Sequence, residues 1–187
     1  MHPGGSHHLT RGETNDKLPL MNSEKAQLFD EWPEAYDRWF TTPIGSLVKK
    51  YETELILNLL NPKGGELILD AGCGTGVFTL DTLSSGSKVI GLDLSRPMLK
   101  RAEEKLKGYP LQIVLADMLH LPFPERSFDK VVSVTALEFI EDGKTAVDEL
   151  FRVTKKGGRI VVATLNSLSP WALRRRGEAK ERQGLLE

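Results

Sequence analysis

The residues best suited to chemistry form a glycine-rich segment, Leu67–Gly76, with the sequence LILDAGCGTG. Its apolar start predicts a strand, and the glycines at 72, 74 and 76 stand directly before a predicted helix. Glycine is needed where the chain turns sharply or where a ligand lies against bare backbone. A helix that follows such a turn directs free N–H groups toward that ligand. The run alone is a weak signal, and its place between strand and helix strengthens it.

Acidic side chains end the next two predicted strands. Asp93 lies about 20 residues after Gly72, the spacing of an acid that accepts hydrogen bonds from ribose hydroxyls. Asp93 could also cap the helix that begins near Ser95, and the two roles are compatible. Asp117 can accept a hydrogen bond from an adenine amine, and Met118 can pack on the ring because a thioether suits aromatic faces. These residues predict a nucleoside site.

A repeated strand–helix pattern must position these residues. The predicted strands are Glu66–Asp70, Lys88–Leu92, Leu111–Leu115, Asp129–Val134 and Arg159–Leu165, and the helices between them are Gly76–Ser84, a helix from Ser95 through Lys107, and Asp142–Val153. Such alternation predicts a parallel sheet with helices on both faces. The glycine loop and both acids then lie at the carboxyl ends of adjacent strands, where open α/β sheets bind ligands.

Two helices are predicted before the first strand. Ser23 caps the first, Glu24–Phe40, which Pro33 should kink or split. The second, Ile44–Leu60, should be amphipathic because apolar residues recur at every fourth position, at Leu47, Tyr51, Leu55 and Leu59. The aromatic residues of the first helix could line an acceptor pocket or dock the helix on the core, and both interpretations stay open for Trp32, Tyr36, Trp39 and Phe40.

The composition excludes several classes of protein. A chain of 187 residues with 40% hydrophobic and 27% charged residues suits one globular domain, not a large multidomain enzyme. The net charge is −1, which gives no global attraction to nucleic acid or to an anionic membrane. No apolar run reaches the ~20 residues that span a bilayer. The single Cys73 forms no internal disulfide. We therefore expect a soluble cytoplasmic protein without nucleic-acid or membrane partners.

Taken in order, four segments resemble class I S-adenosylmethionine-dependent methyltransferases, most closely the small-molecule branch that includes the ubiquinone and menaquinone biosynthesis type. The segments are Leu69–Gly76, Gly91–Ser95, Ala116-Asp117 and Leu121–Asp129. The ordered set is much more specific than any one motif. The resemblance implies an α/β, Rossmann-like, mostly parallel sheet in the order 3-2-1-4-5. It also implies S-adenosyl-L-methionine as cofactor and S-adenosyl-L-homocysteine as product.

The same resemblance implies a set of cofactor-binding residues. These are Asp70, Ala71, Gly72, Cys73, Gly74, Asp93, Leu94, Asp117, Met118, Thr135 and Tyr36. In the family, the loop that starts at Asp70 holds the methionine part, Asp93 the ribose and Asp117 the adenine. Thr135 would flank the cofactor after the fourth strand, and Tyr36 would close over it from the N-terminal cover.

The glycine loop differs from that of nicotinamide-dependent enzymes. A dinucleotide fold prefers Gly-x-Gly-x-x-Gly, which places the third glycine one position after Gly76. The acid at the start of this loop, Asp70, would repel a pyrophosphate, whereas the methionine moiety carries an ammonium group. The electrostatics therefore favour a sulfonium cofactor over a dinucleotide.

The catalytic residues are left open by the sequence. Methyl transfer from a sulfonium needs no covalent enzyme intermediate, so the protein mainly contributes alignment and exclusion of water. A general base is required only if the acceptor must lose a proton, and the candidates are Glu138 and, after it, His120. Cys73 could be a nucleophile near a helix start, but the chemistry needs no thiol, so we expect a small structural residue. We predict no metal site.

The motifs divide the chain into a leader or tag at 1–20, a helical cover at 21–62, a cofactor-binding domain at 63–166 and a polar tail at 167–187. Members of the family usually add a sixth and a seventh strand, and the pattern lacks both, so we expect a truncated or naturally short C-terminus. The fifth strand would then be an apolar sheet edge, and such edges are usually paired or covered. We expect the tail to cover it, or a second copy of the chain to pair with it in a homodimer.

Three functions follow from these observations. The first is a methyltransferase that moves a methyl group by in-line attack to a small-molecule acceptor. The second is a module that binds the cofactor without turnover because its C-terminus is short. The third is a nicotinamide-dependent oxidoreductase, which the glycine spacing disfavours.

Overall fold

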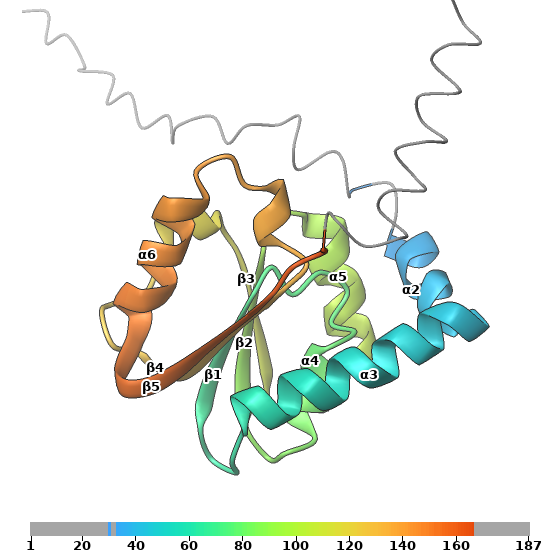
Figure 1. The fold of residues 1–187 in the computed structure, drawn as a ribbon, viewed down its shortest axis with the longest axis horizontal. Helices are drawn as coiled ribbons and strands as arrows, with labels where there is room; N and C mark the ends of the chain where they lie inside the picture. Colours follow the sequence, from blue (N-terminus) through green and yellow to red (C-terminus); the bar gives the residue numbers. More distant parts are fainter. Residues whose placement is uncertain (1–29, 31–32, 167–187) are drawn as a thin grey trace, which may run out of the picture.

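The computed structural model describes residues 30 and 33–166, which form a five-stranded sheet flanked by helices (Figure 1). The strands are β1 Leu67–Ala71, β2 Lys88–Asp93, β3 Leu111–Leu115, β4 Phe128–Val134 and β5 Thr154–Ala163. The helices are α2 Pro33–Thr41, α3 Pro43–Leu60, α4 Thr79–Leu83, α5 Arg96–Lys105 and α6 Gly143–Val153, with short 3-10 helices η1 Met118–His120 and η2 Leu137–Phe139. The predicted leader and tail lie outside the described residues.

Every pair of neighbouring strands is parallel, and the order is β3-β2-β1-β4-β5. The predicted Rossmann-like order is therefore confirmed. β1 lies at the centre, where Asp70 is in register with Gly91 of β2 and Val132 of β4. Within residues 33–166, no sixth or seventh strand extends the sheet beyond β5. The carboxyl ends of β1, β2, β3 and β4 thus meet at one end of the sheet.

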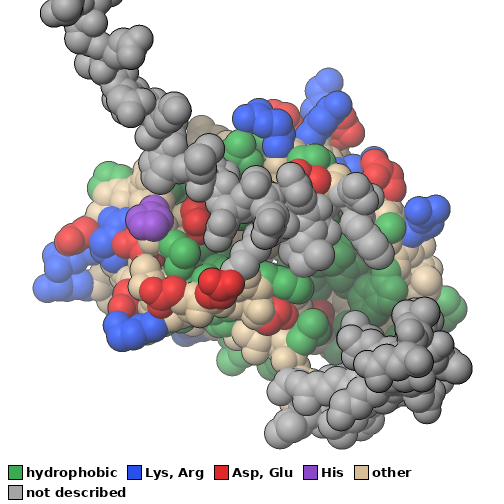
Figure 2. Space-filling model, turned by 90° about the horizontal axis from the view of Figure 1, so that it is seen from above, with side chains coloured by type: hydrophobic (Ala, Val, Ile, Leu, Met, Phe, Trp, Pro, Cys, Tyr) green, Lys and Arg blue, Asp and Glu red, His purple; other side chains and the backbone are tan. Residues whose placement is uncertain are grey.

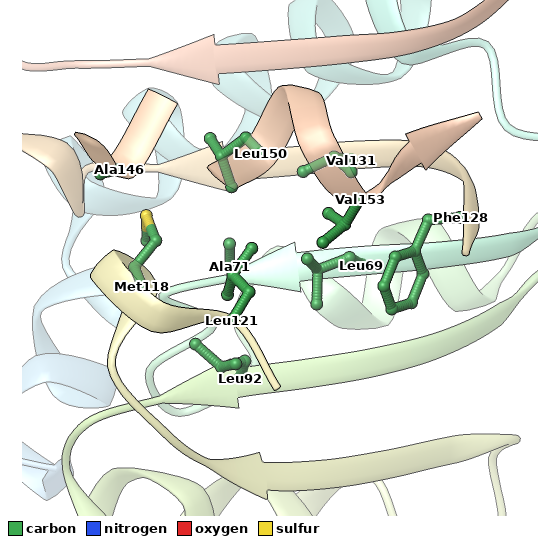
Figure 3. Close-up of a cluster of buried hydrophobic side chains, with 10 residues drawn as sticks. All are labelled: Leu69, Ala71, Leu92, Met118, Leu121, Phe128, Val131, Ala146, Leu150 and Val153. Carbon is green, nitrogen blue, oxygen red and sulfur yellow. The ribbon is translucent and has the colours of Figure 1, made fainter. Parts of the chain in front are cut away.

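The central strands β1 and β4 are buried on both faces, and their successive residues point to opposite sides of the sheet. Leu69 and Val131 face α6, where they form a cluster with side chains from the helix and from β2 (Figure 3). Their neighbours Ile68 and Val132 face the other side and pack in a cluster that includes Ile56 of α3. Fully burying a large apolar side chain stabilises a fold by ~1.5–3 kcal/mol. These two clusters hold the strand ends in fixed positions.

Helix α3 forms as predicted, but its apolar stripe is not its buried face. Thr42 caps the helix by accepting a hydrogen bond from the Gly45 backbone N–H at 3.0 Å, and Pro43 occupies the first turn. The buried residues are Gly45, Ile56 and Leu60. The apolar residues whose four-residue spacing predicted the helix are each at least half exposed to solvent. They are Leu47, Tyr51, Leu55 and Leu59.

After residue 60, two elements begin three or more residues away from their predicted starts. The helix after the glycine loop begins at Thr79, not at Gly76, because Gly76 has φ 76°, which a right-handed helix cannot contain. β5 begins at Thr154, five residues before its predicted start at Arg159. The register shifts between Phe128 and Lys130 of β4, so residues 155–158 bulge against a single β4 residue.

No helix of the described part of the chain is both long and apolar enough to cross a membrane.

Candidate functional site

The loop after β1 is attached to β2 by backbone hydrogen bonds. The N–H groups of Gly72 and Cys73 donate to the carbonyl of Leu92 at 2.7 and 3.0 Å. Gly72 has φ 79°, and a Cβ there would lie 2.3 Å from the Cβ of Ala136, so only glycine fits. The glycine run therefore brings the loop against the end of β4 as well as β2.

Asp93 links the loop to the next helix. One carboxylate oxygen accepts from the Gly74 N–H at 2.8 Å and the other from the Ser95 N–H at 2.9 Å. Ser95 itself caps α5, since its Oγ accepts from the Met98 N–H. Burial raises the pKa of Asp93, while these backbone hydrogen bonds oppose the shift. Each oxygen retains acceptor capacity for a ligand hydroxyl.

Asp70 is the most deeply buried acid at this end of the sheet, with 3% of its surface exposed. Its Oδ2 accepts a hydrogen bond from Thr79 Oγ1 at 2.6 Å. Burial and the nearby charge of Asp93 raise the pKa of Asp70 to about 6. No Lys or Arg among the described residues forms an ion pair with Asp70 or Asp93. The two carboxylates give this end of the sheet a negative charge, which favours a cationic group nearby.

The third strand contributes Asp117 and Met118. Asp117 accepts from the Leu119 N–H at 2.9 Å and so caps η1. Met118 is 5% exposed and belongs to the core cluster under α6 (Figure 3). Its methyl would lie 3.4 Å from a Cβ placed on Gly72, so Met118 adjoins the glycine loop. The structure thus brings the predicted residues of three strands to one end of the sheet.

Helix α2 covers this end of the sheet from the N-terminal side. Burial raises the pKa of Tyr36 to about 12, and the side chain of Thr135 opposes this rise. Tyr36 and Phe40 pack edge to face at 5.2 Å, and Phe40 packs on Phe78 in the same way at 5.8 Å. These contacts favour the docking interpretation for Tyr36 and Phe40. Trp39 is 45% exposed, and Trp32 lies outside the described residues.

Asp37, which was not predicted as a site residue, connects α2 to the glycine loop. Its carboxylate accepts from Thr75 Oγ1 at 2.6 Å, from Lys105 Nζ at 2.6 Å and from Arg101 Nε at 2.9 Å. Burial alone would raise the pKa of Asp37, but the hydrogen bonds from Lys105, Thr75 and Arg101 outweigh burial and lower it. One indication was available in the sequence, because Asp37 directly follows the predicted site residue Tyr36. The three residues that donate hydrogen bonds to Asp37 are distant from it in the sequence.

The candidate catalytic residues are exposed. Glu138 lies on η2, and its Oε1 accepts from the Leu165 N–H at 3.3 Å. His120 is the last residue of η1 and is also exposed. Burial raises the pKa of the Cys73 thiol well above its usual range, which supports a structural thiol over a nucleophile. Residues 30 and 33–166 contain no group of three or more side chains that could hold a metal ion.

Figure 2 looks onto this end of the molecule from above the view of Figure 1. Acidic side chains lie among hydrophobic ones on this face, and the Lys and Arg side chains lie mostly at the periphery.

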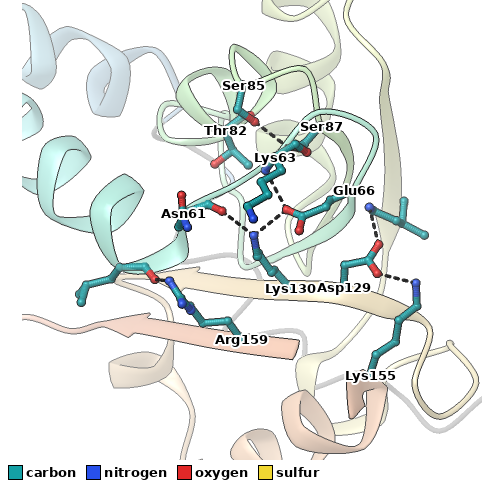
Figure 4. A network of polar contacts seen from close by, with 12 residues as sticks. Asn61, Lys63, Glu66, Thr82, Ser85, Ser87, Asp129, Lys130, Lys155 and Arg159 are labelled. Carbon is teal, nitrogen blue, oxygen red and sulfur yellow. Dashed lines mark hydrogen bonds and ion pairs between the residues drawn. The ribbon is translucent and has the colours of Figure 1, made fainter. Parts of the chain in front are cut away.

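The amino end of the sheet is different in character (Figure 4). Lys130 Nζ donates to Glu66 at 2.6 Å and to the carbonyl of Asn61, and Lys155 Nζ donates to Asp129 at 2.6 Å. Asp129 also accepts from the Leu67 N–H at 2.9 Å. The acids here are paired with lysines. These hydrogen bonds and ion pairs connect the end of α3 with β1, β4 and β5.

The comparisons with known proteins agree with this geometry. A family model described as a methyltransferase domain matches residues 69–162. An uncharacterized methyltransferase of Geobacillus sp. strain WCH70 is 35% identical over 148 residues, which are 76% of this chain and 68% of that protein. The demethylmenaquinone methyltransferase of Clavibacter sepedonicus is 37% identical over 154 residues, 80% of this chain and 61% of that protein. The chain therefore spans about two thirds of the length of these two relatives.

Solved structures give the same result. A SAM-dependent methyltransferase from Thermotoga maritima superposes with a TM-score of 0.62 and 26% identity, over 83% of this chain and 69% of that one. One from Mesorhizobium loti has a TM-score of 0.56 and 33% identity, over 59% and 52%. The matched family segment contains the glycine loop, Asp93 and Asp117. The chain belongs to the methyltransferase-domain family of S-adenosylmethionine-dependent enzymes, in the group that includes the menaquinone-type methyltransferases.

Proposed function

We propose that the protein transfers a methyl group from S-adenosyl-L-methionine to a small-molecule acceptor. The observation that carries the proposal is the buried, unneutralised Asp70 beside the glycine loop. The cofactor combines an α-ammonium group, a ribose and an adenine, and it requires acceptors for all three. Asp70, Asp93 and Asp117 supply such acceptors at the ends of adjacent strands. A Cβ placed on Gly74 would meet no atom within 4 Å, which leaves open space beside the loop.

Each residue of the site has a specific role in this proposal. Asp70 faces the ammonium end, and the other predicted loop contacts are Ala71, Gly72, Cys73 and Gly74. Asp93 accepts from the ribose hydroxyls, with Leu94 beside it. Asp117 accepts from the adenine amine, and Met118 packs along one edge. Thr135 and Tyr36 close the site from β4 and α2.

The bound sulfonium supplies an activated methyl group, so the chain's own residues need not form a covalent intermediate. The glycine loop and Asp93 fix one reactant, and α2 limits the access of water. Tyr36, with its pKa near 12, stays protonated at neutral pH and can donate a hydrogen bond. Glu138 is the first residue to test as a general base, and His120 the second. The attacking acceptor must approach in line with the bond that breaks.

Two alternatives are weaker. A module that binds without turnover finds no support, because the relatives compared above are named as methyltransferases. A nicotinamide-dependent enzyme would place a pyrophosphate near Asp70, which repels it. A cytoplasmic location, with no nucleic-acid or membrane partner, is part of the proposal and rests on the neutral composition and the single cysteine.

A metabolite screen by mass spectrometry tests the proposal. Incubation with S-adenosyl-L-methionine and a mixture of small organic acceptors should yield a product heavier by one methyl group, together with S-adenosyl-L-homocysteine. Cofactor binding without any released S-adenosyl-L-homocysteine would favour the binding module. An unchanged rate for Glu138→Gln with an identified acceptor would remove Glu138 as a base.

A further inference from the structure

Helix α3 carries a carboxylate on its inner face. The buried residues of the helix are Gly45, Ile56 and Leu60. Glu52 lies about two turns after Gly45 and about one turn before Ile56, so it shares this face of the helix. Its side chain is partly buried, whereas Glu54, about half a turn further on, is exposed. Glu52 therefore points toward the body of the molecule, where a charged group is costly unless it meets a partner.

The direction of α3 places Glu52 near the carboxyl ends of the strands. At the end of the helix, the carbonyl of Asn61 accepts a hydrogen bond from Lys130, near the start of β4. Earlier in the helix, Ile56 packs in the same cluster as Val134, the last residue of β4. The helix thus runs against the direction of β4. Because Glu52 is one turn nearer the start of α3 than Ile56, it lies closer still to the carboxyl end of the sheet.

Contacts with α4 hold α3 in this rotation. Thr53 Oγ1 donates to Asp81 Oδ2 at 3.1 Å, and Lys49 Nζ forms an ion pair with the same oxygen at 3.6 Å. Lys49, the cation nearly one turn before Glu52, is therefore engaged by α4. No Lys or Arg of the described residues forms an ion pair with Glu52, and its carboxylate accepts no hydrogen bond from them. Both oxygens keep their capacity to bind a ligand.

Tyr36 of α2 relates Glu52 to the proposed cofactor site. Burial is the main cause of the raised pKa of Tyr36. The negative charges of Glu52, Asp70 and Asp93 add to the rise, so all three carboxylates lie near its hydroxyl. In the proposed function, Asp70 faces the ammonium group of the cofactor and Asp93 the ribose, and the sulfur lies between these two groups along the cofactor. Tyr36 thus lies beside the expected position of the sulfur, with Glu52 on its α3 side.

We propose that Glu52 binds the proton-bearing group of the methyl acceptor, an amine or a hydroxyl, beside the sulfur of the cofactor. This inference rests on the proposed function and names the acceptor class of that site. A neutral amine or a hydroxyl donates a hydrogen bond to the carboxylate and keeps a lone pair for attack on the methyl carbon. Glu138 is exposed and already accepts from the Leu165 N–H, so Glu52 is better placed to meet an acceptor.

The transfer then balances without another reactant. The lone pair of the nitrogen or oxygen forms a bond to the methyl carbon, the bond between that carbon and sulfur breaks, and its electron pair stays on sulfur as a thioether. The proton of the acceptor passes to the Glu52 carboxylate. Burial raises the pKa of Glu52 above its usual value, which favours uptake of this proton.

Sinefungin tests the position of Glu52 without an acceptor. This analogue of S-adenosyl-L-methionine carries an amine on carbon in place of the methyl-bearing sulfur. The wild-type chain should bind it more tightly than S-adenosyl-L-homocysteine in calorimetric titrations, because the amine reaches Glu52. Glu52→Gln should weaken sinefungin binding about tenfold, by loss of a charged hydrogen-bond partner, and leave the affinity for S-adenosyl-L-homocysteine as in wild type. The matched control Glu54→Gln removes the same charge from an exposed position of α3 and should change neither affinity.

The two ligands distinguish a failure of this inference from a failure of the proposed function. A wild-type chain that binds neither ligand would overturn the proposed function, and the inference with it. A Glu52→Gln variant that binds both ligands as the wild type does, or that loses affinity for both equally, would overturn the inference alone.

The product of the metabolite screen tests the acceptor class. Tandem mass spectrometry should place the new methyl group on nitrogen or oxygen. Glu52→Gln should lower the rate of product formation by about 100-fold or more, since an amide cannot take up the proton, while Glu54→Gln should keep the wild-type rate. A methyl group on carbon or sulfur, or an unchanged rate in Glu52→Gln, would contradict the proposal.

Discussion

The two ends of the sheet use the same kind of side chain in opposite ways. At the amino end, Glu66 and Asp129 are each joined to a lysine. The pKa of Glu66 is lowered because the hydrogen bond from Lys130 outweighs burial, and that of Asp129 is lowered by the hydrogen bond from Lys155. At the carboxyl end, burial raises the pKa of Asp70 and of Asp93, and no described cation pairs with them.

This contrast separates residues that stabilise the fold from residues that we propose bind the cofactor. A paired carboxylate contributes to stability, whereas a buried carboxylate without a cation costs stability at neutral pH. Buried carboxylates with raised pKa values are therefore found most often at functional sites. The substitutions below test the contrast, in order of decreasing expected effect.

The largest effect is expected for Asp70→Asn, which removes the buried charge and keeps the shape. With a folded pKa of about 6 against 3.8 in the unfolded chain, the free protein should gain up to about 3 kcal/mol of unfolding free energy at pH 7. Urea unfolding without cofactor measures this gain.

The pH dependence gives a second readout for Asp70. A raised carboxyl pKa means that the folded state takes up the proton first, so the Asp70 contribution to wild-type stability should increase as pH falls through about 6. The variant should lack this increase. A variant that is less stable than wild type at pH 7 would show that Asp70 is satisfied as a charge in the free protein.

Asp93→Ala should weaken binding of S-adenosyl-L-homocysteine by about 1–3 kcal/mol, because acceptors for the ribose are lost and the Gly74 loop is released. Isothermal titration calorimetry gives the change. The control is Asp148→Ala, which removes an exposed aspartate paired with Lys144 and should leave the affinity as in wild type. Equal affinities for wild type and Asp93→Ala would place the ribose elsewhere.

Glu66→Gln should destabilise the fold by about 1–2 kcal/mol, because Lys130, only 8% exposed, loses its carboxylate partner. Cofactor affinity should stay the same, since this end of the sheet holds no part of the site. The lowered pKa of Glu66 means that its contribution is present at neutral pH and is lost as pH falls below the ordinary carboxyl range. A selective loss of cofactor binding in Glu66→Gln would erase the distinction between the two ends.

The smallest stability effect is expected for Asp37→Asn, at less than about 1 kcal/mol, because Arg101 and Lys105 are partly exposed. The α2 cover should nevertheless be held less tightly, so S-adenosyl-L-homocysteine should dissociate faster in stopped-flow experiments. Asp81→Asn is the matched control, because Asp81 also accepts from a threonine and pairs with a lysine but joins α3 to α4. Equal dissociation rates for both variants would show that Asp37 does not fasten the cover.

The sequence predicted the parts of the fold that depend on local pattern. Alternating short apolar runs and helices predicted the parallel sheet, and the glycine loop with Asp93 and Asp117 predicted which strand ends meet. The sequence could not predict the exposed side of α3, since a repeat of apolar residues does not say what covers them. Nor could it predict the Asp37 contacts, because Thr75, Arg101 and Lys105 are brought to Asp37 only by the folded chain.

The first residue of β5 also could not be predicted from the local sequence pattern. Lys155–Gly158 looks like a turn, and only pairing with β4 makes it part of a bulged strand. Gly158 is required there, because a Cβ would lie 2.6 Å from the carbonyl of Asp129.

Calorimetric titration of the wild-type chain with S-adenosyl-L-methionine, S-adenosyl-L-homocysteine and NAD tests the central claim most directly. We predict that both sulfonium-derived ligands bind at one site and compete with each other, because Asp70 and Asp93 favour an ammonium and a ribose. NAD should give no heat of binding, since its pyrophosphate would meet Asp70. Binding of NAD without any response to S-adenosyl-L-methionine would contradict the account.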